Sequence, residues 1–182
     1  LQFSPSTDKV RKTPLLIVPP WINKYYILDL REKNSFIKWA VAQGHTVFVV
    51  SWVNPDEQLG QKTFEDYMLD GLVAAIGAAC DAAGSEKVNV IGYCIGGTMT
   101  ATALAYMADK GDDRVASAAF FTTLVDFEEP GELGIFIDEE QIASLEEKMS
   151  ERGYLAGSEM ATTFSMLRAN DLIWSFVINN YL

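Results

Sequence analysis

Short apolar runs alternate with amphipathic stretches through the first two thirds of the chain. The runs are rich in β-branched residues and end at prolines, glycines or polar residues, as strands buried on both faces do. The stretches between them have helical spacing and begin at residues that can cap a helix. The predicted strands are 14–18, 46–52, 87–91 and 115–124, and the predicted helices, counted from their capping residues, are 34–43, 63–83 and 97–110. This alternation predicts an α/β fold, a parallel sheet with helices on both faces.

The alternation stops after residue 126. The next ten residues are irregular, and Asp138 with Gln141 three positions later then has the pattern of a helix N-cap. We expect that helix to end at Gly153 or Gly157 and one or two further helices to follow up to Leu182. Since no further strand is predicted, this second part is expected to be a helical cap over the edge of the sheet.

Charge is unevenly distributed between these two parts. The net charge is -11, of which residues 1–125 carry -2 and residues 126–182 carry -9. A chain without a basic stripe is not expected to bind nucleic acid. No apolar run is long enough to span a bilayer, and no signal peptide is recognisable. Two cysteines without a disulfide pattern favour a reducing cytoplasm.

The strongest chemical motif is G-x-C-x-G at the end of the third predicted strand. Gly92 and Gly96 flank Cys94 by two residues on either side, and a helix of small residues follows. This order of strand, sharp turn and helix is typical of a nucleophile elbow, here with a thiol at its tip. The N-terminus of the helix would stabilise a thiolate, which is the attacking species. The alternative is a buried, unreactive cysteine in a glycine-rich turn.

An oxyanion hole would need two donors near Cys94. The backbone N–H of Ile95 is one candidate because it follows the nucleophile. The second donor is expected from the loop after the first strand, at Asn23 or Ile22. A purely structural turn is the alternative for that loop.

Other candidate residues favour a structural reading. The single histidine, His45, precedes Cys94 and is predicted at the amino edge of the sheet, too far away to act as its base. No cluster of cysteines and histidines suggests a metal site, and none is expected. The adjacent acidic pairs, which do not face each other, are expected in solvent, and three aromatic residues are expected in the cap core or at a partner surface. These are Glu128/Glu129, Glu139/Glu140, Trp174, Phe176 and Tyr181.

Three blocks of this sequence together resemble poly(3-hydroxyalkanoate) synthases, most closely the class I short-chain type. They are residues 19–30 (PPWINKYYILDL), residues 44–52 (GHTVFVVSW) and residues 92–97 (GYCIGG). The resemblance implies an α/β-hydrolase fold. On this basis residues 1–126 form the first part of the catalytic core with its nucleophile elbow, and residues 127–182 form an incomplete cap.

The resemblance also implies an activity. Such enzymes are acyltransferases that polymerise 3-hydroxyacyl units from coenzyme A thioesters and release coenzyme A, without a cofactor. Cys94 would carry the growing polyester chain as a thioester. The expected setting is a homodimer at the surface of polymer granules in the cytoplasm.

One departure from the family limits what the chain is expected to do alone. The family's catalytic Asp and His follow the cap, and this sequence has no matching positions. We therefore expect an internal piece that is inactive by itself. Two alternatives remain: a hydrolase of the same fold, such as a thioesterase or depolymerase, and a non-catalytic granule-associated piece.

Overall fold

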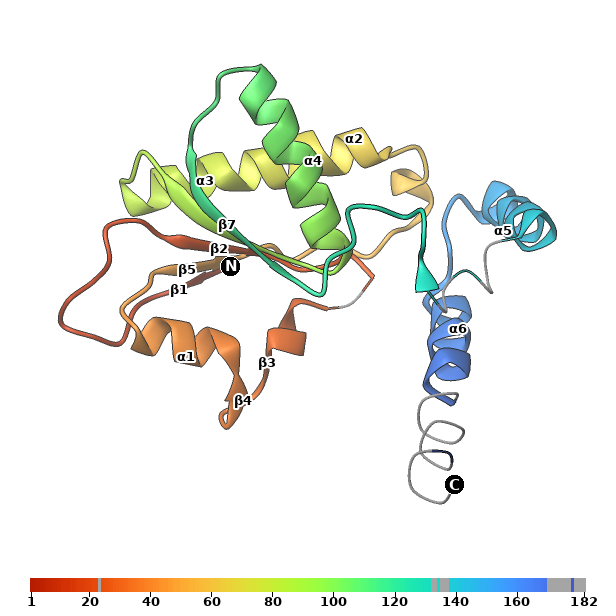
Figure 1. Ribbon diagram of the computed structural model, residues 1–182, viewed down its shortest axis with the longest axis horizontal. Helices are drawn as coiled ribbons and strands as arrows, with labels where there is room; N and C mark the ends of the chain where they lie inside the picture. The colour runs from red at the N-terminus through yellow and green to blue at the C-terminus, as the bar shows by residue number, and fades with distance from the viewer. Residues whose placement is uncertain (23, 132–133, 135–137, 170–177, 179–182) are drawn as a thin grey trace. The chain divides into compact units, whose positions relative to one another are not determined.

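The chain divides into two units, which are described separately. A computed structural model describes residues 1–22, 24–131, 134, 138–169 and 178 (Figure 1). The first unit comprises residues 1–54 and 62–125, and the second comprises residues 55–61 and 126–182. A short segment of the first half of the chain therefore belongs with the C-terminal part.

The first unit is built on a five-stranded, mostly parallel sheet. Its strands in spatial order are β1 (Gln2–Phe3), β5 (Val47–Val49), β2 (Leu15–Val18), β6 (Val88–Tyr93) and β7 (Val115–Phe121). Only β1 runs antiparallel to its neighbour. The four predicted strands are all present. Two are shorter than expected, since β5 ends before Trp52 and β7 before Leu124, whereas β6 continues to Tyr93.

Helices cover both faces of this sheet, as predicted (Figure 1). The helix α1 (Phe36–Ala42) begins where the Ser35 hydroxyl accepts a bond from the Lys38 N–H. The predicted long helix consists of α2 (Phe64–Asp66), the π-helix η3 (Tyr67–Val73) and α3 (Ala74–Ala83). A capping box at Thr63 starts it, and Gly84, with φ 58°, ends it. The helix α4 (Ile95–Asp109) follows β6 directly.

A small substructure between β2 and α1 was not predicted from the sequence. A 3₁₀-helix, η1 (Tyr25–Leu28), leads into a two-stranded hairpin of β3 (Asp29–Arg31) and β4 (Asn34–Ser35). Its strands are too short for the period-two pattern that identifies a strand in a sequence.

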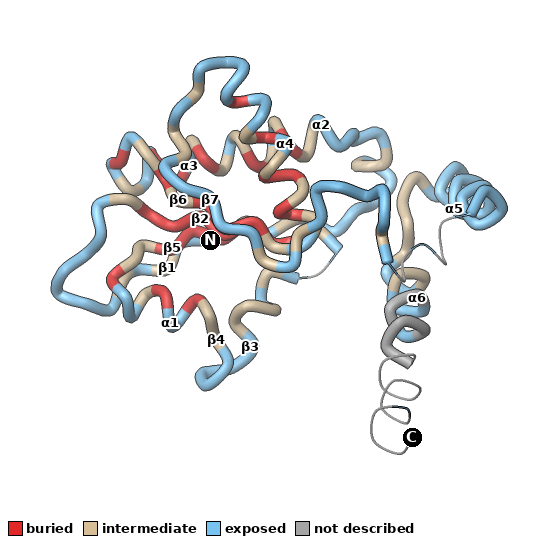
Figure 2. The backbone as a smooth tube through the Cα atoms, in the orientation of Figure 1, coloured by how far each residue is buried: buried red, intermediate tan, exposed pale blue. Residues whose placement is uncertain are grey.

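Alternate residues of the central strands enter two separate cores. Leu16 and Val18 of β2 pack with η3, α3 and α4, whereas Leu15 and Ile17 pack with α1. Figure 2 shows this burial concentrated in the middle strands and the inner sides of the helices. Burial on both faces explains why β2 is a continuous apolar run.

The second unit contains η2 (Glu57–Leu59), α5 (Glu139–Arg152) and α6 (Gly157–Ala169). Asp138 caps α5 by accepting the Gln141 N–H, and Gly153, with φ 79°, ends it, as the sequence predicts. A Cβ on Gly60 would lie 2.7 Å from the Gly153 oxygen, so η2 packs closely against the end of α5. One side of α5 exposes three apolar residues at helical spacing: Ile142, Leu145 and Met149.

Candidate active site

Cys94 forms the turn between β6 and α4 by itself. Its backbone angles, φ 55° and ψ -128°, are ones that residues with a side chain rarely adopt. Three hydrogen bonds hold them. The Cys94 N–H donates to the Phe121 oxygen at 2.9 Å, and its carbonyl accepts from the Gly97 N–H at 2.9 Å and the Thr98 N–H at 3.2 Å. The thiol is exposed, as a nucleophile must be.

The glycines on either side of Cys94 leave no room for a side chain. A Cβ on Gly92 would lie 2.5 Å from the Gly97 Cα. A Cβ on Gly96 would lie 2.3 Å from the Val18 oxygen and 2.8 Å from the Pro19 oxygen. Gly96 therefore allows α4 to start directly against the end of β2.

The segment that follows β7 closes the other side of the elbow. A Cβ on Gly97 would lie 2.0 Å from the Thr123 Oγ1. Thr122 reaches this position with a φ of 44°, which is rare for a β-branched residue. The Thr98 hydroxyl donates to the Leu124 oxygen at 2.6 Å. The second glycine of the Gly96–Gly97 pair was the signal of this close approach.

Candidate oxyanion donors lie at the start of α4 and in the loop after β2. Ile95 is the first residue of α4, where backbone N–H groups have no partner within the helix and the dipole attracts negative charge. The loop after β2 begins at Pro19, against Gly96. Ile22 in this loop is exposed, and Asn23 lies outside the described residues. The choice between these two as second donor stays a prediction.

An aromatic cluster packs around that loop and was also missed. Trp21, in the loop, lies 6.0 Å from Trp52, 6.1 Å from Phe64 and 5.0 Å from Tyr67, between ring centroids. Trp52 and Tyr67 are themselves 5.6 Å apart. These side chains come from three separate segments, so their proximity is not visible in any local sequence window.

His45 lies two residues before β5, at the opposite end of the parallel strands from Cys94. Partial burial, and secondarily the charge of Arg11, lower the pKa of its imidazole. Its Nδ1 is buried, with no hydrogen-bond partner among the described residues. Because this is the only histidine in the sequence, these 182 residues place no imidazole near the thiol.

The remaining candidates form no site in the part of the chain that the structure describes. Glu128, Glu129, Glu139 and Glu140 are exposed. Trp174, Phe176 and Tyr181 lie outside the described residues. No group of acidic, cysteine or histidine side chains could hold a metal ion there. Cys80, the second thiol, is buried in α3, and this burial raises its pKa.

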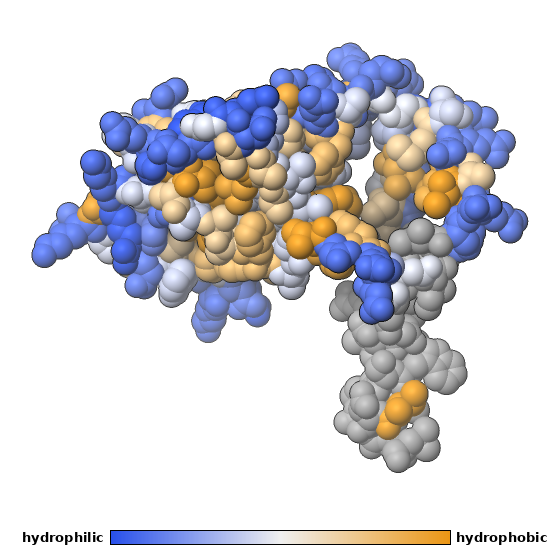
Figure 3. All heavy atoms as spheres, turned by 45° about the horizontal axis from the view of Figure 1, so that its top comes forward, coloured by the Kyte–Doolittle hydropathy of each residue, from blue (hydrophilic) through white to orange (hydrophobic). Residues whose placement is uncertain are grey.

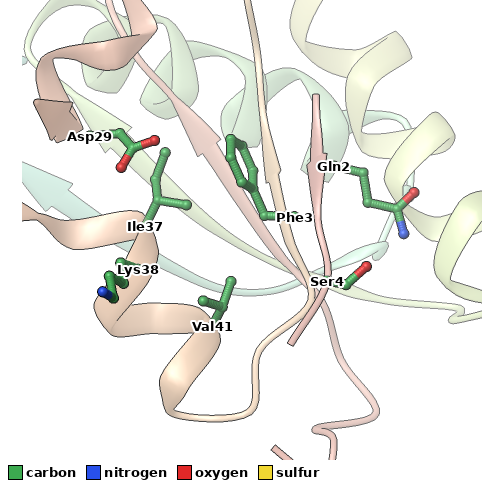
Figure 4. Close-up of a pocket in the computed structure, with 7 residues that line it drawn as sticks. All are labelled: Gln2, Phe3, Ser4, Asp29, Ile37, Lys38 and Val41. Carbon is green, nitrogen blue, oxygen red and sulfur yellow. The ribbon is translucent and has the colours of Figure 1, made fainter. Parts of the chain in front are cut away.

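A pocket of about 400 Å³ lies between β1 and α1 (Figure 4). Phe3, Ile37 and Val41 supply its apolar wall, with Asp29 and Lys38 at its border. It contains none of the candidate catalytic residues. Within the described residues, no helix has both the length and the apolarity to cross a membrane.

Comparison with protein families finds two matching segments. The model for the N-terminus of poly-beta-hydroxybutyrate polymerase matches residues 1–40, and the model for the dienelactone hydrolase family matches residues 56–132, which include the elbow. The mature lipase BlEst2 of Bacillus licheniformis aligns with a TM-score of 0.52 at 14% identity, over 84% of this chain and 66% of that one. With the mostly parallel sheet, these findings show the α/β-hydrolase fold.

Curated relatives match the chain from end to end. The poly(3-hydroxyalkanoate) polymerase of Methylorubrum extorquens is 56% identical over 182 residues, which are all of this chain and 30% of the relative. The corresponding polymerase subunit of Rhizobium meliloti is 55% identical, again over 30% of its length. The Cupriavidus necator subunit is 47% identical over 32% of its length. Over its whole length the chain is thus similar to poly(3-hydroxyalkanoate) polymerases, and it spans about 30% of the length of the curated relatives it matches.

Proposed function

We propose that this chain forms the nucleophile-bearing part of an acyltransferase that polymerises 3-hydroxyacyl-coenzyme A into polyhydroxyalkanoate. The observation that carries the proposal is the exposed thiol of Cys94, held in a strained turn at the N-terminus of α4. The names of the curated relatives supply the reaction.

In this reaction the Cys94 thiolate attacks the thioester carbonyl of the substrate. The carbonyl oxygen becomes an oxyanion, which the Ile95 N–H and a donor from the loop after β2 stabilise. The bond between the carbonyl carbon and the coenzyme A sulfur breaks, coenzyme A leaves as its thiol with the proton that Cys94 gave up on becoming a thiolate, and the acyl group stays on the Cys94 sulfur. Attack by a hydroxyl group on this acyl group then forms the ester bond and returns the Cys94 thiol. Exchange between two thioesters is close to balanced in energy, which favours sulfur over a serine oxygen.

The described residues place no imidazole near Cys94 to act as general base, since His45 lies at the other end of the sheet. We assign the catalytic Asp and His to segments of these polymerases that the 182 residues do not match. The 182 residues alone are therefore expected to be inactive. The cap role of residues 127–182, a homodimer and a position at cytoplasmic polymer granules are further parts of the proposal. The exposed apolar side of α5 supports a role of this helix in contacts with another surface.

A chimera tests the proposal directly. The 182-residue sequence replaces the matching segment of the Methylorubrum extorquens polymerase, and polymer formation from 3-hydroxybutyryl-coenzyme A is measured. We expect the chimera to polymerise and Cys94→Ala to lose at least about 1,000-fold in rate. Cys80→Ala is the matched control and should keep its activity. Polymerisation by the Cys94→Ala chimera would refute the proposal.

A hydrolase of the same fold is the second candidate, favoured by the dienelactone hydrolase match and the lipase neighbour. The product separates the two functions. A polymerase converts 3-hydroxybutyryl-coenzyme A into chloroform-soluble polyester, whereas a thioesterase releases free 3-hydroxybutyrate. Free acid as the main product of the chimera would favour the hydrolase.

A further inference from the structure

Two loops meet at the carboxyl edge of the sheet, next to the elbow. One follows β2 and the other follows β5, and the two strands are neighbours. The Trp52 Nε1–H, from the second loop, donates to the Pro19 oxygen of the first at 2.8 Å. Five residues further along the first loop, the Lys24 ammonium donates to the Asn54 side-chain oxygen. Two hydrogen bonds, at Pro19 and at Lys24, therefore hold the loop after β2 to the loop after β5.

The carbonyl that Trp52 holds is part of the elbow's packing. The Pro19 oxygen lies where a Cβ on Gly96 would approach within 2.8 Å. The Val18 oxygen, in β2, lies closer still, at 2.3 Å from such a Cβ, so the strand itself supports the start of α4. A shift of Pro19 therefore acts mainly on Trp21 and Ile22, which follow in the loop.

The indole of Trp52 has little freedom to choose another partner. A Cβ on Gly71 would lie 2.6 Å from its Cζ3 atom, so the ring rests on the backbone of η3. Trp21 meets it nearly perpendicularly, at an interplanar angle of 82°. The π-helical turn and its glycine thus accommodate a large ring whose N–H points at a backbone carbonyl. π-Turns are frequent at functional sites.

We infer that Trp52 is a positioning residue for acyl transfer, fixing the loop after β2 so that its backbone stands at a set distance from Cys94. The inference rests on the proposed function. Trp52 touches no reacting atom and acts through Pro19. Loss of its N–H frees the loop that supplies the second oxyanion donor. Stabilisation of the transition state then weakens, while the thiol keeps its position and its exposure.

Two reactions of the same thiol test this inference. Acylation of Cys94 needs an oxyanion hole, whereas alkylation by iodoacetamide forms no oxyanion. In the chimera, Trp52→Phe keeps an aromatic ring and removes the N–H. We expect kcat for coenzyme A release to fall about 10-fold, less than the 100-fold or more for loss of a donor itself. KM and the alkylation rate of Cys94 should stay within about two-fold of the unsubstituted values.

Trp39→Phe is the matched control, since Trp39 is an exposed tryptophan on α1, and it should change none of these values. A kcat for Trp52→Phe within about two-fold of the unsubstituted value would overturn the inference. Parallel loss of acylation and alkylation would also overturn it, because that shows general damage to the elbow. If Trp52→Phe does not fold, Asn54→Ala decides on the same criteria. Polymerisation by Cys94→Ala would instead refute the proposed function, whatever Trp52 does.

Discussion

Two apolar strands of the same parallel sheet have opposite environments. In β2 every residue is buried, since β5 and β6 flank it and helices cover both faces. In β7, which among the described residues has a strand neighbour on one side only, residues 116–120 are all exposed. Figure 3 shows apolar residues reaching the surface of the first unit between hydrophilic ones. The elbow thus follows β6, which has strand neighbours on both sides, while β7 offers an apolar edge that can accept a further partner.

The largest expected effect contrasts one residue from each strand. Leu16, in β2, is 2% exposed and Phe120, in β7, is 45% exposed. Leu16→Ala should lower the free energy of unfolding by about 2–5 kcal/mol, because it opens a cavity in the core. Phe120→Ala should cost less than about 1 kcal/mol. Urea unfolding of the 182-residue chain measures both.

The same pair in the chimera sharpens the contrast. If Phe120→Ala lowers the free energy of unfolding of the chimera nearly as much as Leu16→Ala does, another segment covers β7. An equal cost already in the 182-residue chain would contradict the difference between the two strands.

A second test uses the contact between the end of β2 and the elbow. Gly96→Ala places a methyl group against two backbone oxygens, which cannot move aside as a flexible side chain can. We expect the chimera to lose about 100-fold in polymerisation rate, because the turn at Cys94 must shift. Gly157→Ala is the control, since a Cβ there meets nothing within 4 Å. Equal activities of the two variants would show that the elbow tolerates displacement.

A third test compares the two thiols. Cys94 is exposed at the end of β6, whereas Cys80 is buried in α3, where burial raises its pKa. Iodoacetamide should label Cys94 at least about 10-fold faster, because reaction requires access and a thiolate. Mass spectrometry of the folded chain gives both rates, and unfolding in urea should make them similar. Equal rates in the folded chain would instead favour the non-catalytic alternative.

Local patterns were sufficient to predict most of the fold. The apolar runs, the Thr63 and Asp138 caps and the glycines that end helices gave the order and limits of most elements. The π-helical turn was not predictable, because Gly71 is explained only by the distant Trp52 ring that rests on it.

In the candidate site, too, some features could be predicted from the sequence and others could not. The placement of Cys94 between a strand and a helix could be predicted from neighbouring residues alone. Thr123 and Trp52 could not, since each meets the elbow region from a segment far along the chain. Such contacts follow from strand order, which a single sequence leaves open.

The smallest effect is expected for a substitution of His45, which lies at the opposite end of the parallel strands from Cys94. Its pKa is lowered, so below about pH 6.5 the unfolded chain binds more protons than the folded one. Stability should therefore decrease as the pH falls through that value, until the folded imidazole is protonated as well. His45→Gln removes this contribution but leaves the carboxylates. The melting temperature of the unsubstituted chain should thus fall more than that of His45→Gln between about pH 7.5 and 5.5. Parallel melting curves for the two would show that the packing around His45 accepts a charge.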